Sequence, residues 1–552
     1  MTMAIDADEY AKAASSRRTP CRKHLHSVFM HPVSQRTSAF LSPAPAVSLE
    51  KAFPTPFKNV IATARTCYSS KGIIRDEDIT SGFEPLAQSI YQAGHHTTYQ
   101  HAHFQFAMVN ISRQFIWSFL HSHPFYNSEQ VSQRYVAVKP GSFAIPALTG
   151  EALTRYTTAI DEQMAAYEHL TELLMPVVAR EYNKLFTKHN TADKKIQAKL
   201  RKRALEAARY VLPVATFAYM YHTVSGITLL RYYRLCEQFD APTEQREVAT
   251  AMVQALLAHD PLYKTVLEEP LPLEETPEFQ FFEAHHIATQ SASRQQFLTE
   301  FDQSLEGYTA KLIDYKPNNE SVLAASVREV LGLPASILND TDAIELVLSP
   351  TQNRLLGESL NLATMSKLGR TLVHPHYTFR KKLSHTADSQ DQRHRMTPAS
   401  RPVLAAHFTG EPDYITPELI KQEAHIEQFY HDTMARSWER IHQLKACGVS
   451  DEFALYLLPN AVSVRFTESS DLANLHHKHR MRLCYLAQEE IWRASVEEAR
   501  QVRQVNPHIG SHLLPPCTQR LQARSKPICP EGDRFCGVRV WKLDLDEYQR
   551  VF

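Results

Sequence analysis

The chain has 552 residues, more than one hydrophobic core usually supports, so we expect two or more domains. Lys plus Arg and Asp plus Glu are equal at 60 each, which argues against a globally basic nucleic-acid binder and an acidic tail protein. There is no continuous apolar stretch of membrane-spanning length, no signal-peptide core near Met1, and no sign of a disulfide scaffold in the eight cysteines. We therefore expect a cytoplasmic protein that binds neither nucleic acid nor membrane.

The N-terminal segment differs in composition from the rest of the chain. Residues 11–49 contain neither Asp nor Glu and carry scattered Arg, Ser and Pro. Such a segment buries little apolar surface. We expect residues 1–52 to form a disordered or loosely attached arm.

Polar chemistry is concentrated in one segment, which runs from Gly94 to Tyr135. Its residues 101–106 (HAHFQF) alternate with a period of two, which predicts a strand, and an apolar helix-like run follows. The segment ends in a loop of hydroxyl, amide and guanidinium groups that includes Ser132-Gln133-Arg134. A loop of this kind is well suited to holding a phosphorylated ligand.

The chain also contains an internal repeat. The strand predicted at 101–106 has an echo at 374–379, and the segment LPVA at 212–215 corresponds to LPNA at 458–461. In each copy an Ala lies 28 positions after the Pro, and a Glu follows three residues later, Glu244 in one copy and Glu490 in the other. Equal spacing without gaps over that distance indicates a tandem duplication.

The duplication sets the expected domain organisation. We expect a first repeat at 53–267, a Pro- and Glu-rich linker at 268–304, a second repeat at 305–505 and a Cys-containing extension at 506–552. Strands and helices mix without βαβ alternation, so the predicted fold class is α+β, with a mixed sheet and long helices in each repeat. The long helices are expected at 162–184, 198–211, 243–258 and 421–446.

At this point the first repeat resembles the flavin-dependent thymidylate synthase family. The resemblance lies in GHHTTYQHAHFQF, in SRQFIWSFLHSHPFYNSEQVSQRY, in both LP…A…E segments and in KLIDYKPNNESVLAAS of the second repeat. The R-H-R part of the family signature is missing from the first repeat. It falls on His121-Ser122-His123 when counted forward and on Ser122-His123-Pro124 when counted backward from Ser132. A literal R-H-R occurs at 393–395, but the repeat alignment places Gln392-Arg393-His394 over Gln133-Arg134-Tyr135.

The resemblance implies roles for particular residues. In the family the R-H-R segment helps to bind FAD, while the S-x-R-Y loop and two later arginines hold dUMP. The carried-over FAD residues are His95, His121, Ser122, His123, His394 and Arg395. The carried-over dUMP residues are Gln130, Ser132, Arg134, Arg209, Arg393 and Arg482, of which Arg482 and Ser132 are also the expected catalytic residues.

The implied reaction transfers a methylene group from methylenetetrahydrofolate to C5 of dUMP, with FAD as cofactor and NADPH as reductant. The two later arginines are split between the repeats: Arg209 corresponds to Leu455, and Cys236 corresponds to Arg482. Either the repeats complement each other across a shared interface or both sites are decaying. Because sites of the family lie between subunits of a homotetramer, we expect a homodimer of this chain that mimics four units. A paralogue acting on another pyrimidine nucleotide and a non-catalytic nucleotide-binding scaffold are the rival functions.

Two clusters outside this frame have alternative readings. Cys517, Cys529 and Cys536 either bind zinc with a nearby His or are buried free thiols. The run 476–479 (HHKH) is either a metal or phosphate patch or a solvated helix face.

Overall fold

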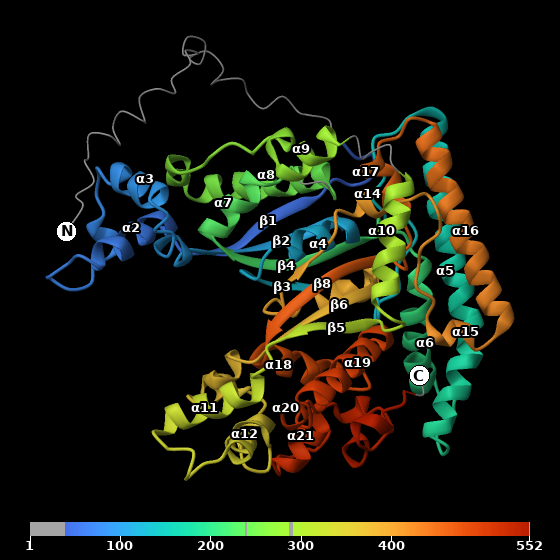
Figure 1. Cartoon of the computed structure of the whole chain (residues 1–552). Coiled ribbons are helices and arrows are strands. Elements are labelled where there is room, and N and C mark those ends of the chain that lie inside the picture. Colours follow the sequence, from blue (N-terminus) through green and yellow to red (C-terminus); the bar gives the residue numbers. More distant parts are fainter. Residues whose placement is uncertain (1–38, 238–239, 286–290, 551–552) are drawn as a thin grey trace. The chain divides into compact units, whose positions relative to one another are not determined.

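The computed structural model describes residues 39–237, 240–285 and 291–550 (Figure 1). The chain divides into two compact units, Met1–Ala39 and Phe40–Phe552. All but Ala39 of the first unit, and with it most of the predicted arm, lies outside the described residues. The following account concerns the unit that begins at Phe40.

The first half is built on a four-stranded antiparallel sheet in the order β1-β2-β4-β3. Its strands are β1 (Ala46–Ala52), β2 (His103–Ser112), β3 (Tyr126–Gln130) and β4 (Phe217–Ser225). Its helices are α2 (Pro56–Thr66), α3 (Glu84–Gln92), α4 (Arg113–His121), α5 (Gly150–Leu185), α6 (Lys194–Ala208), α7 (Gly226–Arg234) and α8 (Pro242–His259).

The second half repeats this plan with a sheet in the order β5-β6-β8-β7. Its strands are β5 (Ala310–Tyr315), β6 (His376–Ser384), β7 (Ala399–Ser400) and β8 (Ser463–Asp471). Its helices are α11 (Asn319–Leu331), α12 (Asp340–Leu348), α13 (His385–Asp391), α14 (Leu404–His407), α15 (Glu418–Lys421), α16 (Ala424–Ala446), α17 (Asp451–Ala454), α18 (Leu472–Arg482), α19 (Glu489–Val505), α20 (Pro507–Gly510) and α21 (Pro516–Gln522).

The same local design forms the centre of each half. Alternation along β2 puts Phe104, Phe106 and Met108 into the core, as the period of two predicts. A serine ends the central strand and caps the next helix: the Ser112 hydroxyl accepts the Phe115 amide hydrogen at 2.9 Å. Ser384 caps α13 in the same way.

The two halves meet through an internal pseudo-two-fold axis. Pro213 and Pro459 form an antiparallel bridge. The Ala215 amide donates to the Tyr456 carbonyl at 2.9 Å, and the pseudo-equivalent Ala461 amide donates to the Tyr210 carbonyl at 3.0 Å. Each half therefore presents the same segment to the other, which is the pattern of a symmetric dimer interface within one chain.

Side chains also form equivalent hydrogen bonds from each half to the other. Glu244 accepts hydrogen bonds from Ser112 of its own half and from the Tyr456 hydroxyl of the other half. Glu490 accepts from Ser384 and from the Tyr210 hydroxyl, at 2.7 and 2.6 Å. Helices α5 and α16 run side by side (Figure 1), and Arg440 on α16 pairs with Glu162 on α5.

Several predicted boundaries differ from the structure. Residues 46–52 were assigned to the arm, but they form the edge strand β1, which pairs with β2 through backbone hydrogen bonds. The predicted linker contains two helices, α9 (Pro277–Ala284) and α10 (Ser291–Ser304). The Cys-containing extension packs into the core of the second half through Ile509, Leu513, Val540, Leu545 and Tyr548. None of the helices within the described ranges is long and apolar enough to cross a membrane.

Candidate active site

A cavity of about 860 Å³ opens where the two halves meet. The first half contributes the loop after β3 and one face of α6, and the second half contributes the end of α18 and the loop that follows it. The C-terminal extension closes a further side. The charged lining residues are Arg134, Lys199, Lys202, Arg203, Glu206, Arg480, Arg482, Arg520, Glu531, Asp533 and Arg534. Cations outnumber carboxylates, so the cavity suits an anionic ligand.

Arg134 is held in place from both halves of the chain. Its Nε donates to Glu206 on α6 at 2.6 Å, and one Nη donates to the Leu486 carbonyl of the second half at 2.7 Å. Burial acts to lower the pKa of Arg134, but Glu206 overcomes this effect and the pKa is raised. The Ser132 hydroxyl accepts the Arg134 amide hydrogen at 3.3 Å and shapes the loop.

Arg209 lies behind this cavity. Its side chain is buried, and its Nε donates to the Glu206 carbonyl at 3.3 Å. One Nη atom has no hydrogen-bond partner among the described residues. An unsatisfied buried guanidinium nitrogen is costly unless a ligand or water pairs with it.

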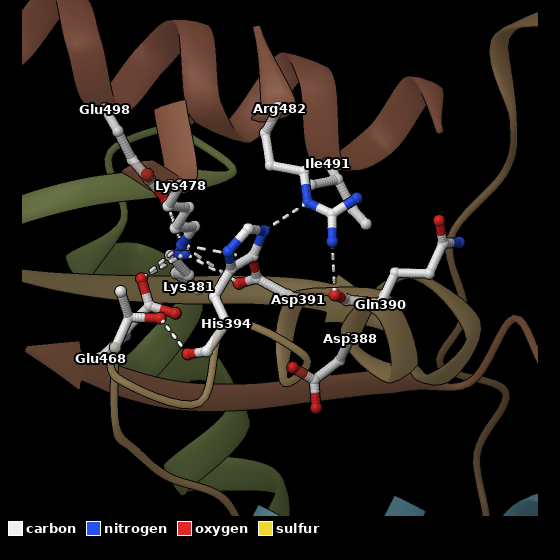
Figure 2. Close-up of polar contacts among 12 residues, drawn as sticks. Lys381, Asp388, Gln390, Asp391, His394, Glu468, Lys478, Arg482, Ile491 and Glu498 are labelled. Carbon is white, nitrogen blue, oxygen red and sulfur yellow. Dashed lines mark hydrogen bonds and ion pairs between the residues drawn. The ribbon is translucent and has the colours of Figure 1, made fainter. Parts of the chain in front are cut away.

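Arg482 reaches the cavity from the end of α18. It donates from Nε to His394 Nε2 at 2.7 Å and from Nη2 to the Gln390 carbonyl at 2.8 Å (Figure 2). Burial, followed by the positive charge of Arg482, holds the pKa of His394 well below its ordinary value. His394 is therefore neutral, as an acceptor from arginine must be.

A cluster of buried charges lies beside His394, which separates it from Arg482 (Figure 2). Lys381 contacts Asp391, Glu468 and Glu498 at 2.9, 2.9 and 2.6 Å. Lys478 contacts the same three carboxyl groups, and all five side chains are at most 1% exposed. Burial raises the pKa of Glu468, whereas the two lysines hold the pKa of Asp391 well below its ordinary value despite burial. Buried charges of this kind are tolerated only when they are paired, as they are here.

Comparisons with known proteins agree with this geometry. The model of the family described as "Thymidylate synthase complementing protein" matches residues 48–262 and again residues 311–508. The two regions coincide with the two halves and cover most of the chain. The chain belongs to the thymidylate synthase complementing protein family. The predicted resemblance to flavin-dependent thymidylate synthases and the tandem architecture are confirmed.

Individual relatives each match less than half of the chain. The chain is 27% identical over 215 residues to the flavin-dependent thymidylate synthase of Clostridium tetani, covering 38% of this chain and 80% of that protein. It is 31% identical over 153 residues to the enzyme of Sulfurisphaera tokodaii, covering 26% of this chain and 57% of that protein. A solved structure of the UMP/dUMP methylase PolB from Streptomyces cacaoi, bound with 5-Br dUMP, overlaps 41% of this chain and 95% of its own at 20% identity and a TM-score of 0.29.

Sheet register corrects the predicted position of the R-H-R tripeptide. Ser400 pairs with Thr467 in the second half, as Glu129 pairs with Tyr221 in the first. Counting back from this pair places residues 393–395 over 122–124, and counting forward from the matched cap serines Ser384 and Ser112 places them over 121–123. These are the two predicted positions of R-H-R in the first repeat. The predicted overlay of Gln392-Arg393-His394 on Gln133-Arg134-Tyr135 is therefore wrong. The second repeat keeps R-H-R, and the first keeps S-x-R-Y.

Three FAD-binding residues predicted in the first repeat are occupied by local packing. The ring of His121 packs 4.6 Å from Trp117, and burial lowers its pKa to about 3. His123 lies 4.9 Å from the Tyr232 ring, and burial lowers its pKa to about 4. The Ser122 hydroxyl donates to the Phe119 carbonyl. These residues and the exposed His95 do not line the large cavity, so the structure does not bring them to Arg134 and Arg482.

The remaining predicted residues lie at a second cavity, of about 300 Å³. Gln130, Arg393 and Arg395 line it. Arg393 pairs with Glu129 at 2.7 Å, Arg395 lies 5.2 Å over the Tyr126 ring, and Gln130 accepts from Arg113 at 2.8 Å. Gln130, Arg393 and Arg395 do not line the large cavity with Arg134, although both halves contribute to this second cavity.

The cysteines and the histidine run differ from their predictions. Cys517, Cys529 and Cys536 gather with Cys484 around a cavity of about 20 Å³, but no group of side chains in the described part of the chain is arranged to hold a metal ion. The zinc interpretation is therefore not supported. His476, Lys478 and His479 are buried, so the run at 476–479 is not a solvated helix face.

Sequence reasoning missed most cations of the large cavity. Lys199, Lys202 and Arg203 come from KKIQAKLRKR at the start of α6, a charge run whose only signal was its density. Arg520 and Arg534 come from the extension, beyond the family match. Helix α6 has 15 residues, whereas its counterpart α17 has four, so only one half supplies these cations.

Proposed function

We propose that this chain is a flavin-dependent thymidylate synthase-like enzyme with one composite active site per chain. The proposed reaction is reductive methylation of dUMP at C5 with methylenetetrahydrofolate, FAD and NADPH. The observation that carries this proposal is that Arg134 of the first repeat and Arg482 of the second repeat line the same cavity. The arginines that the two repeats lost individually are thus present together.

The pseudo-symmetric location supports a single site. Under the register that aligns the halves, Arg134, Arg209 and Arg482 correspond to Ala405, Leu455 and Cys236. None of these three can bind a phosphate with charge-assisted hydrogen bonds. One location therefore retains all three arginines while its counterpart lacks all three, which favours complementation over decay of both sites.

The residues present fit a phosphorylated cofactor and a nucleotide. Arginine and lysine side chains dominate the charged lining. Tyr182, Phe186 and Tyr485 add flat apolar surface that suits a ring system. We infer that Arg134, Arg482 and the His394 loop hold FAD and dUMP here. When bound, the flavin supplies hydride chemistry that side chains lack.

The protein's own residues bind and orient in this proposal. Arg134 and Arg482 hold anionic groups, Glu206 fixes the guanidinium plane of Arg134, and neutral His394 fixes that of Arg482. Cys484 also lines the cavity, but burial raises the pKa of its thiol to about 11. A protonated thiol is a poor nucleophile, which agrees with a mechanism that needs no covalent cysteine.

The test begins with the visible spectrum of freshly purified protein and with tritium release from 5-tritiated dUMP in the presence of methylenetetrahydrofolate and NADPH. We expect a flavin band, activity and one dUMP bound per chain. R134M and R482M should each abolish turnover, while R354M, at an exposed site, serves as the matched control. No flavin and no tritium release would refute the enzyme, and two dUMP per chain would refute the single site.

The loss of R-H-R from the first repeat keeps one alternative in view, a paralogue acting on another pyrimidine nucleotide. Thermal shifts with dUMP, UMP and dCMP separate the two, because a ligand bound only by the folded state raises the melting temperature. A scaffold would bind a nucleotide without flavin turnover.

A further inference from the structure

Five buried positions carry charged side chains in the second half and uncharged side chains at the equivalent places in the first half. Strand register and the aligned helices relate each residue of the buried charge cluster to an uncharged counterpart in the first half. The pairs are Lys381 and Met108, Asp391 and Phe119, Glu468 and His222, Lys478 and Tyr232, and Glu498 and Met252. Every one of these ten side chains is buried.

The first half shows that the fold does not need charges there. The Phe119 ring packs against the Tyr232 ring at a tilt, with a centroid separation of 4.1 Å, and the His222 Nε2 lies 3.1 Å from the Tyr232 hydroxyl, so the space is filled by rings. Burying several charges costs solvation energy that their mutual attraction repays only in part, and apolar replacements of similar volume are often at least as stable. Stability is therefore a poor explanation for the cluster in the second half.

What distinguishes the second half is its neighbour, the Arg482–His394 pair. Both lysines contact Asp391, the last residue of α13. The Asp391 carbonyl accepts the His394 amide hydrogen at 3.0 Å, and the carbonyl of the adjacent Gln390 accepts from Arg482 at 2.8 Å. Lys478 also lies one helical turn before Arg482 on α18. The cluster thus ties together the two segments that carry Arg482 and His394 (Figure 2).

We propose that the buried Lys381–Asp391–Glu468–Lys478–Glu498 cluster positions Arg482 and His394 for nucleotide binding, and that these five are positioning residues of the single composite site. This inference rests on the proposed function. The lysines clamp the Asp391 carboxylate, which fixes the end of α13, and the end of α13 fixes the guanidinium of Arg482. The counterpart location carries Cys236 in place of Arg482 and needs no such clamp.

The chain offers its own replacement set for a test. The exchange variant K381M/D391F/E468H/K478Y/E498M gives the second half the side chains of the first. We expect it to fold with an unchanged or higher melting temperature and to bind dUMP at least about ten-fold more weakly than the wild type. Failure to fold would overturn the proposal, because the cluster would then be structural.

A local readout separates positioning from the proposed function. Hydrogen–deuterium exchange should speed up across residues 388–397 in the exchange variant, while the equivalent segment 116–125 stays unchanged as an internal control. Restoring Lys381 and Asp391 together should recover slow exchange and part of the dUMP affinity. Unchanged exchange at 388–397 in the variant would overturn the positioning proposal. Failure of the wild type to bind dUMP would refute the proposed function and leave the exchange result to decide the positioning role.

A double-mutant cycle with R482M completes the test. If the cluster acts through Arg482, the exchange should weaken dUMP binding in the wild type and have little further effect in the R482M background. Independent, additive losses would overturn the proposal.

Discussion

Removing the Tyr456 hydroxyl is a direct test of the pseudo-symmetric interface. In Y456F, Glu244 loses the hydrogen bond that reaches it from the other half, while the donors from Ser112 remain. Tyr456 and Glu244 are both buried, so water does not replace the lost donor readily. The pseudo-equivalent variant Y210F removes the 2.6 Å hydrogen bond to Glu490 and also the acceptor of Gln488.

The expected loss in the free energy of unfolding follows from the charge of the acceptor, the glutamate carboxylate. Hydrogen bonds to charged groups contribute about 1.5–3 kcal/mol, so each variant should lower the free energy of unfolding by about that amount. Burial raises the pKa of Glu244 to about 7. The carboxylate needs its donors most when it is ionised, so the loss in Y456F should be larger at pH 8 than at pH 5.

Urea unfolding of the wild type, Y456F, Y210F and the double variant at both pH values measures these losses. The double variant should lose roughly the sum of the single losses if the two carboxylates act independently. A loss below about 0.5 kcal/mol in both single variants, typical of an inert surface site, would refute the idea that the halves satisfy each other's buried glutamates.

Three further predictions concern stability and assembly. Burial lowers the pKa of His222 to about 3, so below pH 6.5, its ordinary pKa, the unfolded chain takes up a proton on this residue and the folded chain does not. The free energy of unfolding therefore decreases by about 1.4 kcal/mol for each unit by which the pH is lowered. H222F should reduce the dependence of urea stability on pH between pH 7 and 5, and an unaltered dependence would contradict this assignment. Asp388 accepts hydrogen bonds from Arg401 at 2.7 and 2.8 Å and from Trp117 of the first half. D388A should therefore lower the free energy of unfolding by about 3–5 kcal/mol, and D388L/R401M should recover much of that loss because no buried charge is left unpaired. An unchanged free energy of unfolding in D388A would show that the pair is not needed. We expect light scattering to give twice the chain mass of 63.0 kDa, and a strictly monomeric protein would contradict the predicted homodimer.

Particular residues show where sequence reasoning succeeded. The equal spacing from Pro213 to Glu244 and from Pro459 to Glu490 predicted the duplication, because both segments build the same interface and the same capped strand-to-helix junction. The alternation at 101–106 predicted β2 for a similar reason, since one face of that strand is buried throughout.

Other features of the structure were not predictable because the sequence carries too weak a pattern for them. Strand β7 has only two residues, so no alternation marked it, and the short match of Gln392-Arg393 to Gln133-Arg134 displaced the alignment that the sheet register reveals. Buried lysine is rare, so nothing in the sequence marked Lys381 as a core residue, yet it is fully buried among carboxylates from β8, α13 and α19. Such partners converge only in three dimensions.

The antiparallel bridge between Pro213 and Pro459 has a consequence for how this molecule can change. In a symmetric dimer of identical chains, every substitution appears twice, so a residue that improves one location must also be tolerated at the other. Joining the two copies in one chain removes that coupling. Lys381 and Met108 occupy matching places with different side chains, and further divergence of either half can proceed without a penalty in its twin.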